Sequence, residues 1–217
     1  MGSKGHVQEG MKQLKIFDLS VPLEEGMPYF KGDPIPEIRQ FKSIKDNGYN
    51  LKELKIGTHT GTHVDAPSHF IENGKTIDQL DLSDLMGSAT CLSYDPFRQL
   101  KLPEEHYDII FLYTGYNLSW GKFKTFENFS YIKDKDAGSL RNYGVKVVGI
   151  DSPSAEIQNS KSFDVHRILL GNSIPIVENL NSVTLSGLVD HSFTVQVMPI
   201  LVKGGDGAPA RVIAIEE

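Results

Sequence analysis

Three of the chain's seven histidines fall within residues 59–69, in the stretch His59-Thr-Gly-Thr-His63-Val-Asp65-Ala-Pro-Ser-His69. Glycine, proline and β-branched residues interrupt this stretch, so a helix is disfavoured and a strand leading into a tight loop is expected. Imidazole nitrogens and a carboxylate gathered on a short loop are ligands that divalent transition metals prefer. The spacing therefore predicts a metal site, against the alternative of surface and capping histidines.

The residues between the histidines are suited to holding them rigidly. Gly57 and Gly61 are expected to let the backbone approach an ion closely, because glycine has no side chain. Pro67 is expected to stiffen the exit from the loop. The hydroxyl groups of Thr60 and Thr62 are expected to orient the ligands by hydrogen bonding.

The composition is that of an ordinary globular protein. At 217 residues, with 39% hydrophobic and 23% charged residues, the chain is long enough for one domain with a buried core. The net charge of −6, from 22 basic and 28 acidic residues, argues against a nucleic-acid surface. No apolar run approaches the ~20 residues that a membrane span requires, and no signal sequence is evident. We therefore expect a cytoplasmic protein without nucleic-acid or membrane partners.

The start of the chain differs in character from the rest. Residues 1–10 are polar and rich in glycine, whereas a more apolar segment begins just after Met11. We expect residues 1–10 to be a cloning remnant or a disordered tail, and residues 11–217 to form a single domain.

Apolar segments separated by turn residues predict more strands than helices. The expected strands span residues 14–21, 51–58, 88–94, 108–113, 145–150, 174–177, 193–202 and 211–215. Helical spacing predicts short helices within residues 76–86, 134–143, 163–170 and 182–188. Gly144 and Gly171 are placed to end the second and third helices. The fold class that follows is α/β, one domain with a largely β core.

Two more residues with metal-binding side chains occur far downstream of the histidine stretch. His166 falls in the expected helix 163–170, and Glu178 closes an apolar strand. Asp151 follows the buried strand 145–150 in the same way and is a candidate helper. Acidic groups placed at the ends of buried strands are candidates for a functional site. The alternatives are a histidine on a helix surface and solvated carboxylates at strand ends.

The histidine stretch resembles the motif H-x-G-T-H-x-D-x-P-x-H of the metal-dependent cyclase-like hydrolases, a family that includes bacterial kynurenine formamidase and isatin hydrolase. The resemblance extends upstream to Phe17-Asp-Leu-Ser-Val-Pro-Leu-Glu-Glu-Gly-Met-Pro. Downstream it continues in Gly149-Ile-Asp-Ser-Pro-Ser and in the segment from His166 to Glu178. Together these segments cover most of residues 11–217.

This resemblance implies a centre of two divalent metal ions, zinc or manganese, held by five residues: His59, His63, Asp65, His166 and Glu178. The first three would hold one ion, Asp65 would bridge to the second, and the last two would complete the second set. His69 is then the catalytic proton donor and acceptor rather than a ligand. The implied fold is a swivelling-type β/β/α domain with a central β-barrel-like mixed sheet and short peripheral helices. The family is normally homo-oligomeric, so we expect a homodimer or homotetramer.

The sequence departs from the family's pattern in the substrate pocket. Kynurenine formamidases of this type carry a tryptophan in a Pro-x-Trp-x-Gly-Asp stretch, and the matching residues here are Pro28-Tyr29-Phe30-Lys31-Gly32-Asp33. Phe30 therefore replaces the tryptophan, and the sole tryptophan, Trp120, lies elsewhere. A phenylalanine can stack on a planar substrate ring but cannot donate a hydrogen bond. Phe30 is the predicted substrate-binding residue.

The expected chemistry is hydrolysis by metal-activated water. A divalent ion lowers the pKa of its water from about 15.7 to about 7 and polarises the scissile carbonyl. A nitrogen leaving group needs a proton, and the imidazole of His69, with an ordinary pKa of about 6.5, is suited to give it. The leading hypothesis is an amidohydrolase acting on a small-molecule aryl formamide such as N-formylkynurenine.

Two alternatives stay open. One is a related reaction: opening of an isatin-like cyclic amide or a lactone, or ring closure of a carbonyl compound. The other is a non-catalytic metal-binding protein, which a non-ligating His69 disfavours, because storage of a metal needs no base beside the ligands. The chain has no G-x-S-x-G motif, which counts against a serine enzyme of the α/β-hydrolase type.

Overall fold

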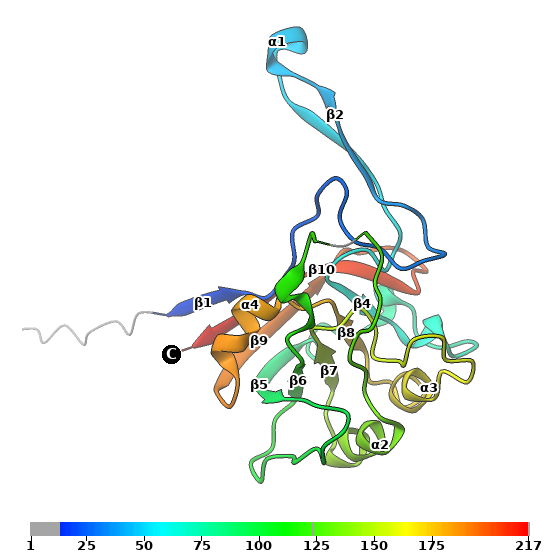
Figure 1. Cartoon of the computed structure of the whole chain (residues 1–217), viewed down its shortest axis with the longest axis vertical. Helices are drawn as coiled ribbons and strands as arrows, with labels where there is room; N and C mark the ends of the chain where they lie inside the picture. Colours follow the sequence, from blue (N-terminus) through cyan, green and yellow to red (C-terminus); the bar gives the residue numbers. More distant parts are fainter. Residues whose placement is uncertain (1–13, 123, 217) are drawn as a thin grey trace, which may run out of the picture.

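The computed structural model describes residues 14–122 and 124–216, so the expectations for residues 1–10 lie outside the described part. Its strands are β1 (Lys15–Asp18), β2 (Glu37–Lys42), β3 (Leu51–Lys55), β4 (His63–Asp65), β5 (Met86–Ser93), β6 (Ile109–Tyr113), β7 (Val147–Ile150), β8 (Ile176–Glu178), β9 (Ser192–Pro199) and β10 (Gly207–Glu216). Seven of them form a barrel in the order β10-β4-β8-β7-β6-β5-β9, which closes because β9 also pairs with β10 (Figure 1). β1 adds to β10 outside this ring.

The barrel sheet is mixed. Strands β5 to β8 pair in parallel, and the other barrel pairs are antiparallel. One apolar core receives side chains from all seven barrel strands and therefore fills the barrel. Ile109 and Phe111 of β6 belong to this core, whereas Ile110 and Leu112 belong to a second core outside it. Burial on both faces explains why β6 is a continuous apolar run. The expected α/β fold with a barrel-like mixed sheet is confirmed.

Short helices lie outside the barrel, and α2 (Asp134–Tyr143) and α3 (Asp164–Leu170) pack on the second core (Figure 1). α2 ends as predicted at Gly144, whose φ of 90° is left-handed and therefore suits glycine. α4 (Ser182–Leu185) continues as a 3-10 turn to Leu188, which matches the helix expected at residues 182–188.

The helix expected within residues 76–86 is wrong. Only a 3-10 turn (Ile77–Gln79) forms there, and β5 already begins at Met86. Asp81 accepts hydrogen bonds from both the backbone N–H and the hydroxyl of Ser83. Such local side-chain bonds compete with helical hydrogen bonding and explain why the apolar spacing does not produce a helix.

A hairpin of β2 and β3 extends away from the barrel, with the short helix α1 (Ile44–Asn47) at its tip (Figure 1). We call residues 37–55 the arm. All five residues of β3 are exposed, and ion pairs join Arg39 to Glu53 and Lys55 to Glu37 across the two strands. The sequence predicted β3 but neither β2 nor α1. The polar, mixed pattern of these two segments lacks the apolar periodicity by which the other elements are recognised.

Candidate metal centre

The short strand β4 carries two predicted ligands into the middle of the sheet. β4 lies between β8 and β10, and His63 is the antiparallel partner of Glu178 on β8. Directly opposed residues on neighbouring strands project from the same face of a sheet. The Nε2 atom of His63 accordingly lies 3.6 Å from Glu178 Oε2. Asp65, two residues further along β4, places its Oδ1 3.3 Å from the same nitrogen.

His166 reaches the same point from helix α3. Its Nε2 atom lies 3.5 Å from Asp65 Oδ2 and 3.4 Å from Glu178 Oε1. His63, Asp65, His166 and Glu178 are all buried, between 1% and 4% exposed. Polar groups buried this deeply need partners or an ion, and here they face one another.

The outer nitrogens of two of these histidines are held by acceptors. His166 Nδ1 lies 3.3 Å from Glu156, whose carboxylate also accepts the backbone N–H of Val165 at the start of α3. His63 Nδ1 lies 2.9 Å from the carbonyl oxygen of Gly61. Fixing Nδ1 in this way directs Nε2 of each imidazole toward the centre, which is the arrangement typical of metal-binding histidines.

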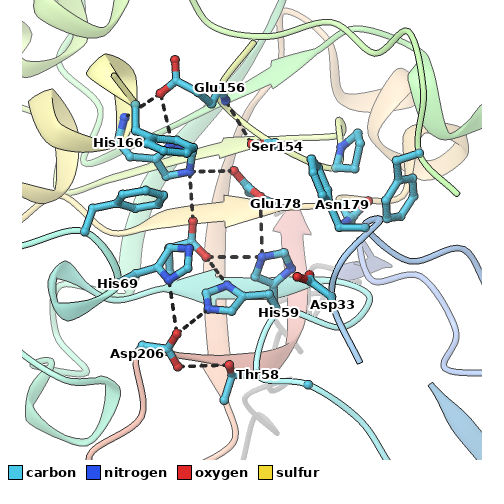
Figure 2. Close-up of a pocket in the computed structure, with 18 of the residues that line it drawn as sticks. Asp33, Thr58, His59, His69, Ser154, Glu156, His166, Glu178, Asn179 and Asp206 are labelled. Atoms are coloured by element: carbon cyan, nitrogen blue, oxygen red, sulfur yellow. Dashed lines mark hydrogen bonds and ion pairs between the residues drawn. The ribbon is translucent and has the colours of Figure 1, made fainter. Parts of the chain in front are cut away.

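His59 and His69 form a second group beside Asp65 (Figure 2). His59 Nδ1 lies 2.7 Å from Asp65 Oδ1, and its Nε2 lies 3.0 Å from Asp206 Oδ2. The ring of His69 lies 4.0 Å from that of His59, and its Nδ1 is 3.2 Å from the same Asp206 oxygen. The structure therefore brings together all six residues predicted for the centre: His59, His63, Asp65, His69, His166 and Glu178.

The donor set fits divalent metal ions. Two groups of three side chains each have ligand atoms within 4.8 Å of one another, and Asp65 belongs to both: His59, Asp65 and His69, and His63, Asp65 and Glu178. A carboxylate shared in this way is what a bridging ligand requires. Imidazole and carboxylate donors are typical of zinc and manganese sites. Because the first group contains His69, its role as proton carrier rather than ligand stays a prediction.

The centre stabilises positive charge. Burial opposes protonation of His59, but hydrogen bonds to Asp65 and Asp206 outweigh it and raise its pKa to about 9. Burial likewise opposes protonation of His166, but its acidic partners raise its pKa well above the ordinary value. Burial raises the pKa of the Asp65 carboxyl, but the imidazoles around it outweigh this effect and hold the pKa well below its usual range. A site that favours protons this strongly also favours a metal cation in their place.

The environment of His69 differs from those of His59 and His166, because it disfavours the protonated imidazole. Burial lowers the pKa of its imidazole, and the neighbouring His59 and His166 lower it further against the attraction of Asp65 and Asp206. A lowered pKa favours the neutral imidazole near pH 7, the form that can accept a proton.

The centre opens into a cavity of about 580 Å³ with aromatic walls. Phe30 lines it as predicted, and its ring lies 6.4 Å from that of Phe126. Phe70 and Phe163, 4.9 Å apart, also line the cavity. Trp120 is absent from the described lining residues, and its ring lies 6.1 Å from that of Phe126. The volume is in the range of sites for small molecules, about 300–1,000 Å³.

Two carboxylates of the site were missed by sequence reasoning. Asp206 lies in a glycine-rich turn directly before β10, and Glu156 lies in the loop after β7. Each binds a nitrogen of one or two of the predicted histidines. Asp206 could have been noticed as an acidic residue where a glycine-rich turn meets a strand. Glu156 carries no comparable local signal.

Asp151 is not a helper at the centre. It follows β7 as predicted and is fully buried, but it is absent from the lining of the cavity. Its oxygens accept hydrogen bonds from the backbone and hydroxyl of Thr114, the backbone of Gly115 and the hydroxyl of Ser182. Asp151 therefore anchors the loop that follows β6.

The small residues of the histidine stretch also act differently from expectation. Gly61 has a φ of 68°, and a Cβ atom there would lie 2.8 Å from Leu23, so the turn itself requires glycine. The hydroxyl of Thr60 accepts the backbone N–H of Gly57. The hydroxyl of Thr62 bonds backbone groups as well. These threonines fix the loop rather than bonding the ligands directly.

Comparison with known proteins gives the family. Residues 17–157 match the model of the Cyclase family ("Putative cyclase"). The chain is 31% identical to the kynurenine formamidase of Geobacillus thermodenitrificans, over 89% of this chain and 94% of that protein. A solved structure named "Potential Metal-Dependent Hydrolase With Cyclase Activity" has a TM-score of 0.77 at 25% identity, covering 94% of this chain and 99% of the other. Isatin hydrolase A from Ralstonia solanacearum has the same fold, with a TM-score of 0.77 at 17% identity over 94% and 92% of the two chains.

The chain therefore belongs to the cyclase family. The hydrolases that it resembles and the buried donor set of the cavity support an enzyme of the metal-dependent hydrolase class. Among the described residues, no helix has the length and apolar character needed to cross a membrane.

Proposed function

We propose that the protein is a metal-dependent amidohydrolase that cleaves the C–N bond of a small aryl formamide, with N-formylkynurenine as the representative substrate. The observation that carries this proposal is the position of Asp65 next to an aromatic-walled cavity. Its Oδ1 faces His59 and His63, and its Oδ2 faces His166. The identity to a kynurenine formamidase supports the substrate class.

Two divalent ions, zinc or manganese, are the proposed cofactors, held by His59, His63, Asp65, His166 and Glu178. When bound, such ions supply Lewis acidity that activates water and polarises a carbonyl group. His69 is proposed to accept a proton from the attacking water and to pass it to the leaving nitrogen, and its lowered pKa supports the first of these two roles. Asp206 holds the ring of His69 through Nδ1.

Phe30 is proposed to stack on the aryl ring of the substrate. It is half-buried, lines the cavity and packs against the rings of Phe126 and Phe129, at 6.4 Å and 5.9 Å. A ring held by two others has little freedom, so it presents a fixed apolar wall.

The test combines metal analysis with a substrate panel. We expect the purified protein to contain about one to two equivalents of zinc or manganese, and to lose activity in a chelator and regain it with either metal. Asp65→Ala and Glu178→Ala are expected to remove metal and N-formylkynurenine hydrolysis together, whereas the exposed Asp84→Ala serves as the matched control. A metal-free protein with full activity would overturn the proposal.

A second candidate is hydrolysis of a cyclic amide or a lactone, which the fold shared with isatin hydrolase favours. The same panel therefore includes isatin and a simple lactone. Turnover of one of these without turnover of any aryl formamide would select this candidate and leave the metal site unchanged. Metal binding without turnover of any compound would favour a non-catalytic protein.

We also propose that the protein forms a homodimer or homotetramer through the arm. An isolated two-stranded hairpin is at best marginally stable in water. The arm carries five basic and three acidic residues, so its net charge is +2, and the rest of the chain carries the remaining −8. The rest of a second copy thus has a net charge opposite to that of the arm, which favours their association. Large apolar side chains of the arm are available for this contact: Phe41, Ile44, Tyr49, Leu51 and Leu54 are all at least 45% exposed.

A further inference from the structure

Asn179 directly follows the candidate ligand Glu178, and its backbone is fixed at both ends. Its N–H donates to the carbonyl oxygen of Ser152 at 2.9 Å, and its own carbonyl accepts the hydroxyl of Thr62 at 2.6 Å. Its φ of 58° lies in the left-handed region, which glycine adopts without strain and asparagine tolerates. The backbone therefore needs a left-handed residue here but does not need an amide side chain.

The side chain of Asn179 is buried but has an unused acceptor. The residue is 1% exposed, and its Oδ1 accepts no hydrogen bond from the described part of the chain. A buried carbonyl oxygen without a donor is unfavourable and calls for an explanation. Asn73, which has a similar φ of 60°, is exposed and can bond to water. The left-handed backbone alone therefore does not account for a buried, unpaired acceptor oxygen.

Asn179 belongs to the wall of the cavity that contains the metal centre. Figure 2 shows it beside Glu178, on the side of that carboxylate away from His69. The residue that carries the unused acceptor therefore follows a proposed metal ligand and lines the same cavity as Phe30, the proposed ring-binding residue. A hydrogen-bond donor on a molecule bound in this cavity is the partner that the acceptor lacks.

We propose that Oδ1 of Asn179 accepts a hydrogen bond from the N–H of a bound substrate and thereby selects amides over esters. The inference rests on the proposed function, because it concerns the bond which that function cleaves. A secondary formamide has an N–H next to its scissile carbonyl. An ester or lactone has an oxygen there, which cannot donate and is repelled by a second acceptor. Asn179 is thus a specificity-determining residue.

The test compares two substrates that differ only at this position: formanilide, with an N–H, and phenyl formate, with an oxygen. In the metal-loaded enzyme, Asn179→Gly keeps the left-handed backbone and removes the acceptor. We expect kcat/KM for formanilide to fall about 10- to 100-fold, and kcat/KM for phenyl formate to change by less than about threefold. Using the ratio of variant to wild type for each substrate removes their different intrinsic reactivities.

The controls separate loss of the acceptor from loss of the fold or the metal. Asn73→Gly makes the same substitution at an exposed left-handed position and is expected to leave both substrates unaffected. Asn179→Asp keeps an acceptor oxygen and is expected to retain the preference for formanilide, with metal content measured for every variant. Equal loss on both substrates, no loss on formanilide, or an Asp variant that behaves like the Gly variant overturns the proposal.

Failure of the proposed function is distinguishable from failure of this inference. If wild-type enzyme hydrolyses neither compound, the proposed function fails, and binding of isatin and N-methylisatin is measured by calorimetry instead. N-methylation removes the ring N–H, so it is then expected to weaken binding to the wild type but not to Asn179→Gly. Equal binding of the two compounds to the wild type, or no binding of either, overturns the role of Asn179.

Discussion

A single carboxylate oxygen of Asp206 faces both His59 and His69. The two imidazoles differ in their other contacts, because His59 also bonds Asp65 at 2.7 Å, whereas His69 packs edge-on against Phe70. The same acidic group thus holds a proposed ligand and a proposed proton carrier side by side. We therefore expect substitution of His59 or of His69 to affect metal content and kcat differently.

The first prediction separates ligand from proton carrier. His69→Ala is expected to keep most of the metal while kcat falls by about two to four orders of magnitude, the range for loss of one general acid or base. His63→Ala is expected to empty the site, because its buried imidazole faces two carboxylates. Elemental analysis and N-formylkynurenine hydrolysis measure both effects. Equal loss of metal in the two variants would make His69 a ligand.

The second prediction is that metal binding releases protons. An imidazole must be neutral to bind a metal, and the pKa of His59 is raised to about 9, with that of His166 also raised. Below these pKa values the ion competes with protons, so its affinity should fall as pH falls, by about tenfold per pH unit for each proton displaced. Titration calorimetry with Zn²⁺ at neutral pH, in two buffers of different ionisation enthalpy, counts these protons. A binding enthalpy independent of the buffer contradicts the prediction.

The third prediction concerns the aromatic wall. Phe30→Ala is expected to raise KM for N-formylkynurenine more than it lowers kcat, because stacking stabilises ground state and transition state alike. Phe97, 83% exposed and outside the cavity lining, provides the matched Phe→Ala control. Steady-state kinetics of both variants decide the matter. A large fall in kcat with KM unchanged would instead assign Phe30 to the transition state.

At the scale of single residues, the sequence identifies site residues that lie close together along the chain. His59 to His69 could be recognised because their spacing is local, and His166 and Glu178 because they follow a family pattern. Asp206 had only a weak local signal and Asn179 had none, because their importance comes from neighbours that only the fold supplies: two imidazoles for Asp206 and a cavity for Asn179. A single aspartate or asparagine in a turn has many ordinary explanations.

At the scale of elements, β10 packs tightly against β4 and the ring of His59 at Gly207. Gly207 is the cross-strand partner of Asp65. A Cβ atom at this position would lie 2.7 Å from the ring of His59 and 2.7 Å from the carbonyl oxygen of Val64. Because one of these contacts is backbone, the strands must shift to accept any side chain there.

The fourth prediction concerns the close packing at Gly207. Gly207→Ala is expected to lower the free energy of unfolding by about 1–3 kcal/mol, as overpacking does, and to weaken metal binding by displacing His59. Gly138→Ala in α2 has open space around its Cβ, so it is expected to be neutral or stabilising by up to about 1 kcal/mol. Denaturant unfolding and metal content measure both variants. Unchanged metal affinity in Gly207→Ala would show that the strands adapt without moving the site.

Elements with a strong apolar pattern were predictable, and those defined by pairing were not. β6 and α2 have clear periodicity and a clear stop, and both were expected close to their observed bounds. β4 is only three residues long and carries two polar ligands, so it resembles a loop until β8 and β10 pair with it. The barrel order was not predictable, because the pairing of β10 with β1 and β4, and of β9 with β5, joins segments distant in sequence.

At the scale of the whole molecule, the fifth prediction concerns assembly. Phe41→Glu and Ile44→Glu place charge on exposed apolar positions of the arm and are expected to convert the oligomer into a monomer. Phe97→Glu, at an exposed position outside the arm, is the matched control for added negative charge. Light scattering after size-exclusion chromatography gives the masses, and circular dichroism reports the fold. A monomeric wild type at micromolar concentration would refute assembly through the arm.

The proposed ligands come from two regions that lie far apart along the chain: β4, and the stretch that contains helix α3 and β8. An ion bound to all of them joins these segments as a cross-link does, since it closes long loops that an unfolding chain has to open. The lifetime of the folded barrel then depends on how slowly the ion leaves. We therefore expect chelation to do more than stop the proposed reaction, because it also shortens the time that each molecule survives heat or a protease.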